Sequence, residues 1–119
     1  MAKILIVDDS KTSRKILRAI LEENGHEVIA EAVNGQDGLE KYRQVQPDLT
    51  TMDITMPVMN GIEALEQIRK HDSNAKVIMV TAAGQKTMLL DAIKFGAAEF
   101  LAKPYEAVQI VNIIQKVLA

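Results

Sequence analysis

Five polar residues stand out because each follows a short apolar run: Asp8, Asp9, Asp53, Thr81 and Lys103. Three carboxylates held close together repel one another, and they do not all ionise at neutral pH without a compensating cation. Mg²⁺ suits that need, because it binds few protein carboxylates, keeps several waters and leaves positions for phosphate oxygens. The lysine supplies a mobile positive charge and the threonine a short hydroxyl donor. Brought together, these groups would suit phosphoryl transfer to a carboxylate.

The apolar runs alternate with stretches of helical periodicity, which predicts five repeats of a strand followed by a helix. The segment 28–30 lies between two glutamates and suits a shorter strand near an edge. Such alternation predicts an α/β fold with a parallel sheet covered by helices on both faces. Right-handed crossovers then point the carboxyl ends of all strands toward one rim, where the five polar residues would meet. The expected strands are 4–7, 28–30, 49–52, 77–80 and 100–102.

Length and composition bound the class of protein. The 119 residues predict a single domain over 1–119, with 48% hydrophobic and 25% charged residues. The absence of cysteine excludes a disulfide framework and a thiol nucleophile, and it fits a cytoplasmic location. Fourteen basic against sixteen acidic residues leave no basic excess for nucleic acid. No apolar stretch reaches the roughly 18 residues of a membrane helix, so we expect no membrane association.

Four segments carry a more specific signal, namely residues 6–10 (IVDDS), 52–61 (MDITMPVMNG), 80–82 (VTA) and 103–104 (KP). Together, in this order and at strand ends, they resemble the receiver domains of two-component response regulators, in particular the single-domain chemotaxis regulators. The resemblance spans the whole chain. It implies a flavodoxin-like, doubly wound, five-stranded parallel sheet with strand order 2-1-3-4-5 and five helices.

The resemblance also implies roles for the acidic residues and their neighbours. Asp53 is the phosphoacceptor. Asp9 and Asp53 ligate Mg²⁺ directly together with the backbone carbonyl of Thr55, while Asp8 acts through water. Lys103 contacts the phosphoryl group. Thr55 also occupies a position that tunes hydrolysis in the family.

The same resemblance implies a switch. Thr81 turns toward the phosphoryl oxygens, which the backbone of Ala82 also contacts, and Phe100 swings inward as Thr81 moves. A tyrosine is common at the position of Phe100, so phenylalanine keeps the packing change without a hydroxyl. The bond before Pro104 is expected to be cis. Ala83 matches a second position that tunes hydrolysis, but it has no polar group to hold an attacking water.

Two other functional classes compete with a phosphorylation-controlled binding module. A Mg²⁺-dependent phosphatase with an aspartyl-phosphate intermediate usually places two aspartates two residues apart after its first strand, whereas Asp8 and Asp9 are adjacent. It also usually needs a cap domain, for which 119 residues leave little room. A flavin carrier would need a hydroxyl- and glycine-rich phosphate loop, and two aspartates would repel a flavin phosphate.

We therefore expect a monomeric switch without a separate output enzyme, phosphorylated by a histidine kinase. Its output is contact with another protein, for which a flagellar motor switch component is the first candidate. The alternative is a phosphorelay intermediate that passes its phosphoryl group to a histidine phosphotransfer protein.

Overall fold

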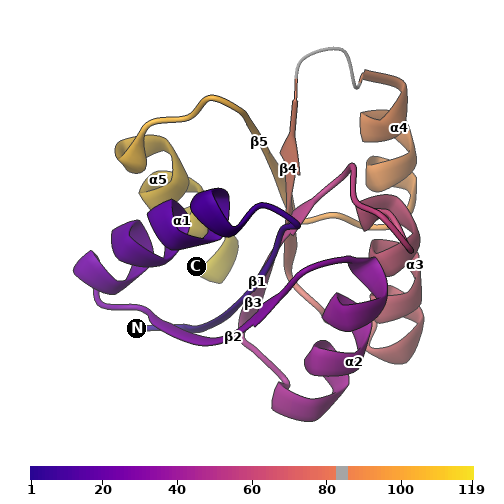
Figure 1. Ribbon diagram of the computed structural model, residues 1–119, viewed down its shortest axis with the longest axis horizontal. Helices are drawn as coiled ribbons and strands as arrows, with labels where there is room; N and C mark the ends of the chain where they lie inside the picture. The colour runs from indigo at the N-terminus through magenta and orange to yellow at the C-terminus, as the bar shows by residue number, and fades with distance from the viewer. Residues whose placement is uncertain (83–85) are drawn as a thin grey trace.

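The computed structural model of the protein describes residues 1–82 and 86–119, so the expected role of Ala83 lies outside the described residues. Strands and helices alternate along the chain, as the sequence predicts (Figure 1). The elements are β1 (Lys3–Val7), α1 (Lys11–Glu23), β2 (Glu27–Ala32), α2 (Gly35–Val45), β3 (Leu49–Asp53), α3 (Gly61–His71), β4 (Val77–Thr81), α4 (Lys86–Lys94), β5 (Glu99–Ala102) and α5 (Ala107–Leu118).

The strands form one parallel sheet in the order β2-β1-β3-β4-β5, which confirms the predicted doubly wound topology. The register pairs Val7 with Met52, and Thr81 with Ala102. The carboxyl ends of β1, β3, β4 and β5 therefore lie along one edge of the sheet. β2 lies at an edge as expected, but with six residues it is not a shorter strand. Its backbone pairs with β1 along its whole length, across a register shift, so the flanking glutamates belong to the strand.

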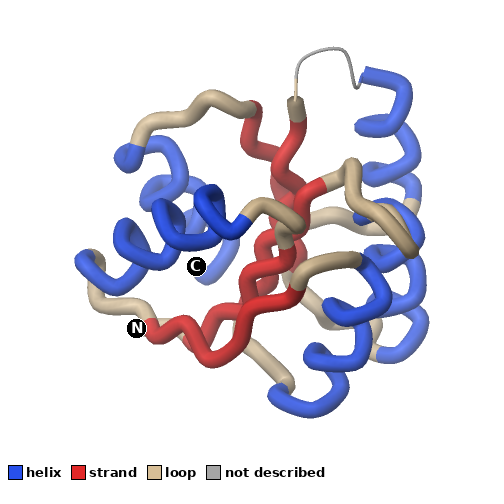
Figure 2. The backbone as a smooth tube through the Cα atoms, viewed as in Figure 1, coloured by secondary structure: helices blue, strands red, loops and turns tan. Residues whose placement is uncertain are grey.

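Helices cover both faces of the sheet. Figures 1 and 2 show α1 and α5 on one side of the central strands and α2, α3 and α4 on the other. Alternate residues of β1 point to opposite faces, with Ile4 and Ile6 in the core under α1 and α5, and Leu5 and Val7 in the core under α2 and α3. Both faces of the strand are buried, which explains the continuous apolar run. No helix in the described part of the chain is long and apolar enough to cross a membrane.

Three helices begin at a polar residue whose side chain accepts a hydrogen bond from the backbone three residues later. Ser10, Asn34 and Asn60 act in this way for α1, α2 and α3. Such caps satisfy backbone donors that have no partner inside the helix. Ser10 ends the loop after β1, and Asn60 ends the loop after β3. These two caps therefore fix where the loops that follow the two strands end.

Two threonines of β3 are buried without a side-chain partner. The hydroxyls of Thr50 and Thr51 have no hydrogen-bond partner within residues 1–82 and 86–119. Thr51 lies between Ile6 of β1 and Ile78 of β4 and is 1% exposed. A buried hydroxyl without a partner loses its hydration and regains nothing.

Replacing this hydroxyl by a methyl group should stabilise the fold. We expect Thr51→Val to raise the free energy of unfolding by about 1 kcal/mol, because valine keeps the branched shape and removes the unpartnered oxygen. Urea unfolding would show a higher midpoint at an unchanged slope. Thr50→Val should behave alike, while Thr12→Val on the exposed part of α1 should bring no such gain. A lower midpoint for Thr51→Val would show that its hydroxyl has a partner.

Candidate functional site

The predicted carboxylates meet at the carboxyl edge of the sheet. Asp8 and Asp9 follow β1, and Asp53 is the last residue of β3. One carboxylate oxygen from each of the three lies within 4.8 Å of the others. Lys103, just after β5, places its Nζ 3.1 Å from Asp8 Oδ2 and 3.7 Å from Asp53 Oδ2. Four groups from three strands therefore share one small volume.

The two oxygens of Asp53 are in different surroundings. Oδ1 accepts a hydrogen bond of 2.9 Å from the backbone N–H of Ile54, while Oδ2 faces Lys103. Burial raises the pKa of the Asp53 carboxyl above its usual range. Lys103 opposes that shift, and the charges of Asp8 and Asp9 add to it. Oδ2 is thus the oxygen of Asp53 that faces the cationic side of the site.

Asp8 and Asp9 differ in how they are held. Asp8 is buried, with its Oδ1 accepting from Ser10 N at 2.8 Å and its Oδ2 bound to Lys103. Asp9 is exposed, and its side chain makes no hydrogen bond or ion pair with any residue that the structure describes. Asp9 therefore offers a carboxylate to a ligand without breaking an existing contact.

Lys103 compensates only part of the negative charge. Burial disfavours its ammonium form, but the hydrogen bond to Asp8 and the charge of Asp53 hold the pKa of Lys103 above its usual value. One lysine against three ionised carboxylates leaves two negative charges in a partly buried site. The donors are all oxygen atoms, and a hard divalent cation such as Mg²⁺ matches both their chemistry and their charge. The arrangement thus fits the predicted ion.

The loop after β3 is closed tightly against the sheet. Gly61 N donates to Ile54 O at 2.7 Å, and a Cβ on Gly61 would lie 1.9 Å from the carbonyl oxygen of Asp53. Only glycine allows α3 to begin so close to the phosphoacceptor candidate. The Asn60-Gly61 pair predicts a turn, but this close approach depends on tertiary packing. Thr55 lies exposed in the same loop, two residues after Asp53.

The remaining predicted residues lie on β4 and β5 beside the acidic cluster. Thr81 is buried at the end of β4, and its carbonyl accepts from Lys103 N at 2.7 Å. Phe100 of β5 is partly buried against the core under α2, α3 and α4. Ala82 follows β4 and is exposed, and the peptide bond before Pro104 is cis, as expected.

The described part of the chain also forms hollows outside the acidic cluster. One, of about 380 Å³, is lined by Ser13, Ile16, Ile20, Lys103, Pro104 and Tyr105 and reaches the cluster through the lysine. Ile16 of α1 lines this hollow and is 55% exposed, although it is a large apolar residue.

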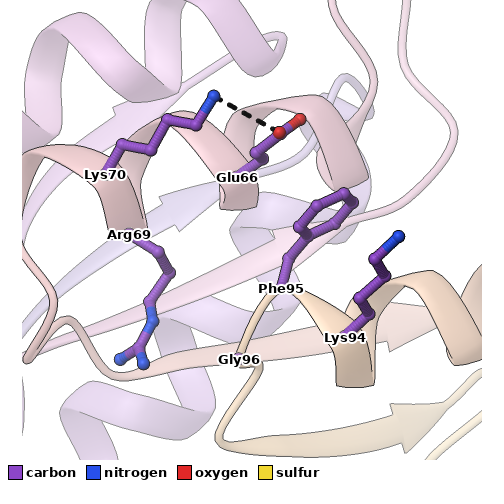
Figure 3. Close-up of a pocket in the computed structure, with 6 residues that line it drawn as sticks. All are labelled: Glu66, Arg69, Lys70, Lys94, Phe95 and Gly96. Atoms are coloured by element: carbon purple, nitrogen blue, oxygen red, sulfur yellow. Dashed lines mark ion pairs between the residues drawn. The ribbon is translucent and has the colours of Figure 1, made fainter.

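Another hollow, of about 360 Å³, lies between α3 and the end of α4 (Figure 3). Its cationic ends point in different directions and do not converge on one position. Lys70 pairs with Glu66 at 3.4 Å, and Arg69 donates to the carbonyl of Ala75. A Cβ on Gly96, whose φ is +87°, would lie 2.8 Å from the Arg69 guanidinium. The Arg69 guanidinium thus lies close against Gly96, which leaves no room for a side chain at that position.

Comparison with known proteins identifies the family of this arrangement. The family model of the response regulator receiver domain matches residues 4–115. The chain is 47% identical to the chemotaxis protein CheY of Thermotoga maritima over 115 residues, which are 97% of this chain and 96% of that protein. It is 49% identical to CheY of Bacillus subtilis strain 168 over 116 residues, 98% and 97% of the two chains. A crystal structure of the CheX-CheY-BeF₃-Mg²⁺ complex from Borrelia burgdorferi matches with TM-score 0.94 and 35% identity, covering 98% and 89%.

The crowding of carboxylates predicts that Asp53→Asn changes stability in opposite directions in the absence and in the presence of metal. Without metal at neutral pH, Asp53→Asn should be more stable than the wild type, because asparagine removes a partly buried charge. The pKa of Asp53 is higher in the folded than in the unfolded protein. The wild type therefore loses stability as pH rises from the unfolded pKa to the folded pKa. Asp53→Asn does not lose this stability, because asparagine does not ionise.

Mg²⁺ should reverse the order of stability. The wild type is expected to gain about 2.7 kcal/mol at a free ion concentration about 100 times Kd, and the variant, lacking one charged ligand, much less. Urea unfolding in EDTA and in Mg²⁺ measures both effects. Asp91→Asn, which changes an exposed aspartate of α4, should follow the wild type in both conditions. Equal stability of Asp53→Asn and wild type in both buffers would contradict this account.

Proposed function

The chain belongs to the response regulator receiver domain family, and from this membership we propose that it is a Mg²⁺-dependent switch that a histidine kinase phosphorylates on Asp53. Family membership makes the chain a phosphoacceptor of two-component signalling that is closely related to CheY. The observation that carries the proposal is the cluster of three carboxylates within 4.8 Å beside Lys103. A receiver needs such a cluster to hold an ion and a phosphoryl group at once.

In this proposal Asp9, Asp53 and the backbone carbonyl of Thr55 hold Mg²⁺ directly, and Asp8 holds it through water. When bound, the ion neutralises charge on the phosphoryl oxygens, which otherwise repel the carboxylates. The Mg²⁺ in the Borrelia burgdorferi CheY complex supports this choice of ion. Lys103, with its Nζ 3.7 Å from Asp53 Oδ2, supplies a second positive charge.

The transfer step needs a nucleophile, and it needs Lys103 to move away from the carboxylates that it contacts. Oδ2 of Asp53 attacks the phosphorus of a phosphohistidine, so a P–O bond forms while the P–N bond breaks. The electron pair of the broken bond stays on the imidazole nitrogen of the donor. Lys103 then turns from the carboxylates to a phosphoryl oxygen, which exchanges one charge-assisted hydrogen bond for another.

The phosphoryl group changes the shape of the protein through β4 and β5. Thr81 turns to bind a phosphoryl oxygen, the backbone of Ala82 binds another, and Phe100 moves inward into the space that Thr81 leaves. A shift from 1:99 to 99:1 needs about 5.5 kcal/mol. New charge-assisted bonds contribute roughly 1.5–3 kcal/mol each, so those of Lys103 and Thr81 reach the required scale. Thr55 and Ala83 set the rate at which water then removes the group.

The partners of this switch are a histidine kinase and a downstream protein that binds the phosphorylated form. The similarity to CheY favours chemotaxis, with a flagellar motor switch component as target. A phosphorelay intermediate, which would pass its phosphoryl group to a histidine phosphotransfer protein, is the second candidate, because the same site serves both. We also propose that residues 1–119 act as one receiver domain, which is supported by one sheet and two cores spanning the chain. In the same proposal, this domain acts in the cytoplasm as a monomer.

A small-molecule phosphodonor tests the acceptor directly. Incubation with an acyl phosphate and Mg²⁺ should label the wild type on Asp53, as mapped by mass spectrometry after reduction of the acyl phosphate. Labelling should be lost in EDTA and in Asp53→Asn, since the first removes the ion and the second the nucleophile. Asp91→Asn should label like the wild type. Full labelling of Asp53→Asn, or equal labelling of the wild type with and without EDTA, would overturn the proposed function.

The switch itself is tested by Thr81→Ala. This variant should be phosphorylated, because Asp53 and the acidic cluster are intact, but its Phe100 ring should not move. NMR spectra with ¹³C-labelled phenylalanine should show the Phe100 signals shift on phosphorylation in the wild type and stay in place in the variant. Thr12→Ala on exposed α1 serves as the control and should shift normally. An equal shift in Thr81→Ala would exclude Thr81 from the coupling.

A further inference from the structure

An arginine of α1 binds the peptide group that joins two of the carboxylates. Arg14 Nη1 donates to the carbonyl oxygen of Asp8 at 2.8 Å. That carbonyl belongs to the peptide plane between Asp8 and Asp9, so its direction sets the direction in which the Asp9 side chain leaves the backbone. The Arg14 side chain is 12% exposed and lies one helical turn after the Ser10 cap.

The same guanidinium is anchored on a neighbouring strand. Arg14 Nε donates to Glu31 Oε1 at 3.0 Å, and Glu31 lies on β2 opposite Ile6 of β1. Arg18 pairs with the second oxygen of Glu31. Burial disfavours the charge of Glu31, but hydrogen bonds from Arg18 and Arg14 lower its pKa below the usual value. The Glu31 carbonyl also accepts a hydrogen bond from Lys41 Nζ at 2.5 Å. Arg14 thus connects the loop after β1 to a fixed point in the sheet.

Asp9 depends on this connection more than its neighbours do. Asp8 is held by Ser10 and Lys103, and Asp53 by the N–H of Ile54. The Asp9 carboxylate is exposed and has no side-chain partner in the described part of the chain. Its position is therefore set by the backbone alone.

We propose that Arg14, anchored by Glu31, is a positioning residue that holds the Asp8–Asp9 peptide so that Asp9 faces the divalent ion. This inference rests on the proposed function, because it assigns Arg14 a role in the same ion site. Arg14 touches no carboxylate of the cluster and acts only through the backbone of Asp8. Groups that orient metal ligands typically change metal affinity about 10–100-fold when they are removed.

The sign of the effect separates positioning from electrostatics. Arg14 carries a positive charge close to a cation site, so loss of its charge by itself would strengthen Mg²⁺ binding. Loss of positioning would weaken it. A residue that acted only through its charge, or only through stability, could not make binding weaker at full folding.

The experiment measures Mg²⁺ affinity by isothermal titration calorimetry for four proteins. Arg14→Met removes both hydrogen bonds, and Arg14→Lys keeps the charge but not the forked geometry that joins two acceptors. Arg18→Met is the matched control, because it removes an equal charge from the same helix and the same Glu31 without touching Asp8. Thermal unfolding in EDTA confirms that each variant is folded at the temperature of the titration.

We expect Kd for Mg²⁺ to rise about tenfold in Arg14→Met and to rise also in Arg14→Lys, with Arg18→Met within twofold of the wild type. An unchanged or lower Kd in Arg14→Met, or an equal rise in Arg18→Met, would overturn the positioning role. A folded wild type that binds no Mg²⁺ would instead overturn the proposed function, so the two failures are distinguishable. If Arg14→Met does not fold, Arg14→Lys decides, because the same comparison applies to it.

Discussion

Repulsion among Asp8, Asp9 and Asp53 is the constraint from which the rest of the site follows, because their oxygens lie within 4.8 Å of one another and Lys103 offsets only part of their charge. The cost of this arrangement is visible in the raised pKa of Asp53, which burial and the neighbouring charges produce. A fold retains such a cost when a ligand relieves it, and in the proposed function a divalent ion at these carboxylates would do so. The same ion would offset the negative charge of an incoming phosphoryl group.

The surrounding structure serves to keep these charges together against their repulsion. Helix caps at Ser10 and Asn60 end the two loops that carry the carboxylates, and Gly61 lets α3 begin directly against the carbonyl of Asp53. Lys103 N binds the carbonyl of Thr81, which fastens the lysine to the strand that is proposed to respond to phosphorylation. The caps use short side chains and the contacts of Gly61 and Lys103 use backbone groups, and both lose less conformational entropy than long side chains would.

The loop after β1 is contacted both by Arg14, which is proposed to position the ion site, and by Lys103, which is proposed to bind the phosphoryl group. Arg14 joins that loop to β2 at the edge of the sheet, whereas Lys103 joins it to β5 at the other edge. In the proposed switch, Lys103 would leave Asp8 for the phosphoryl group while the Arg14 contact holds the Asp8 backbone. The ion site would therefore persist while β4 and β5 rearrange as proposed.

The sequence by itself determined the alternation of strands and helices, the strand ends that carry the five polar residues, and the oxygen chemistry that suits Mg²⁺. These properties are local, because the spacing of apolar residues and the residues that end each element are neighbours in the sequence. Tertiary structure alone decided that Lys103 contacts Asp8 across 95 positions, that Arg14 binds the Asp8 carbonyl, that Ile16 lines an open hollow and that β2 has six residues. Such facts depend on register and on the packing of distant segments, and a pattern of residue types contains neither until the chain has folded.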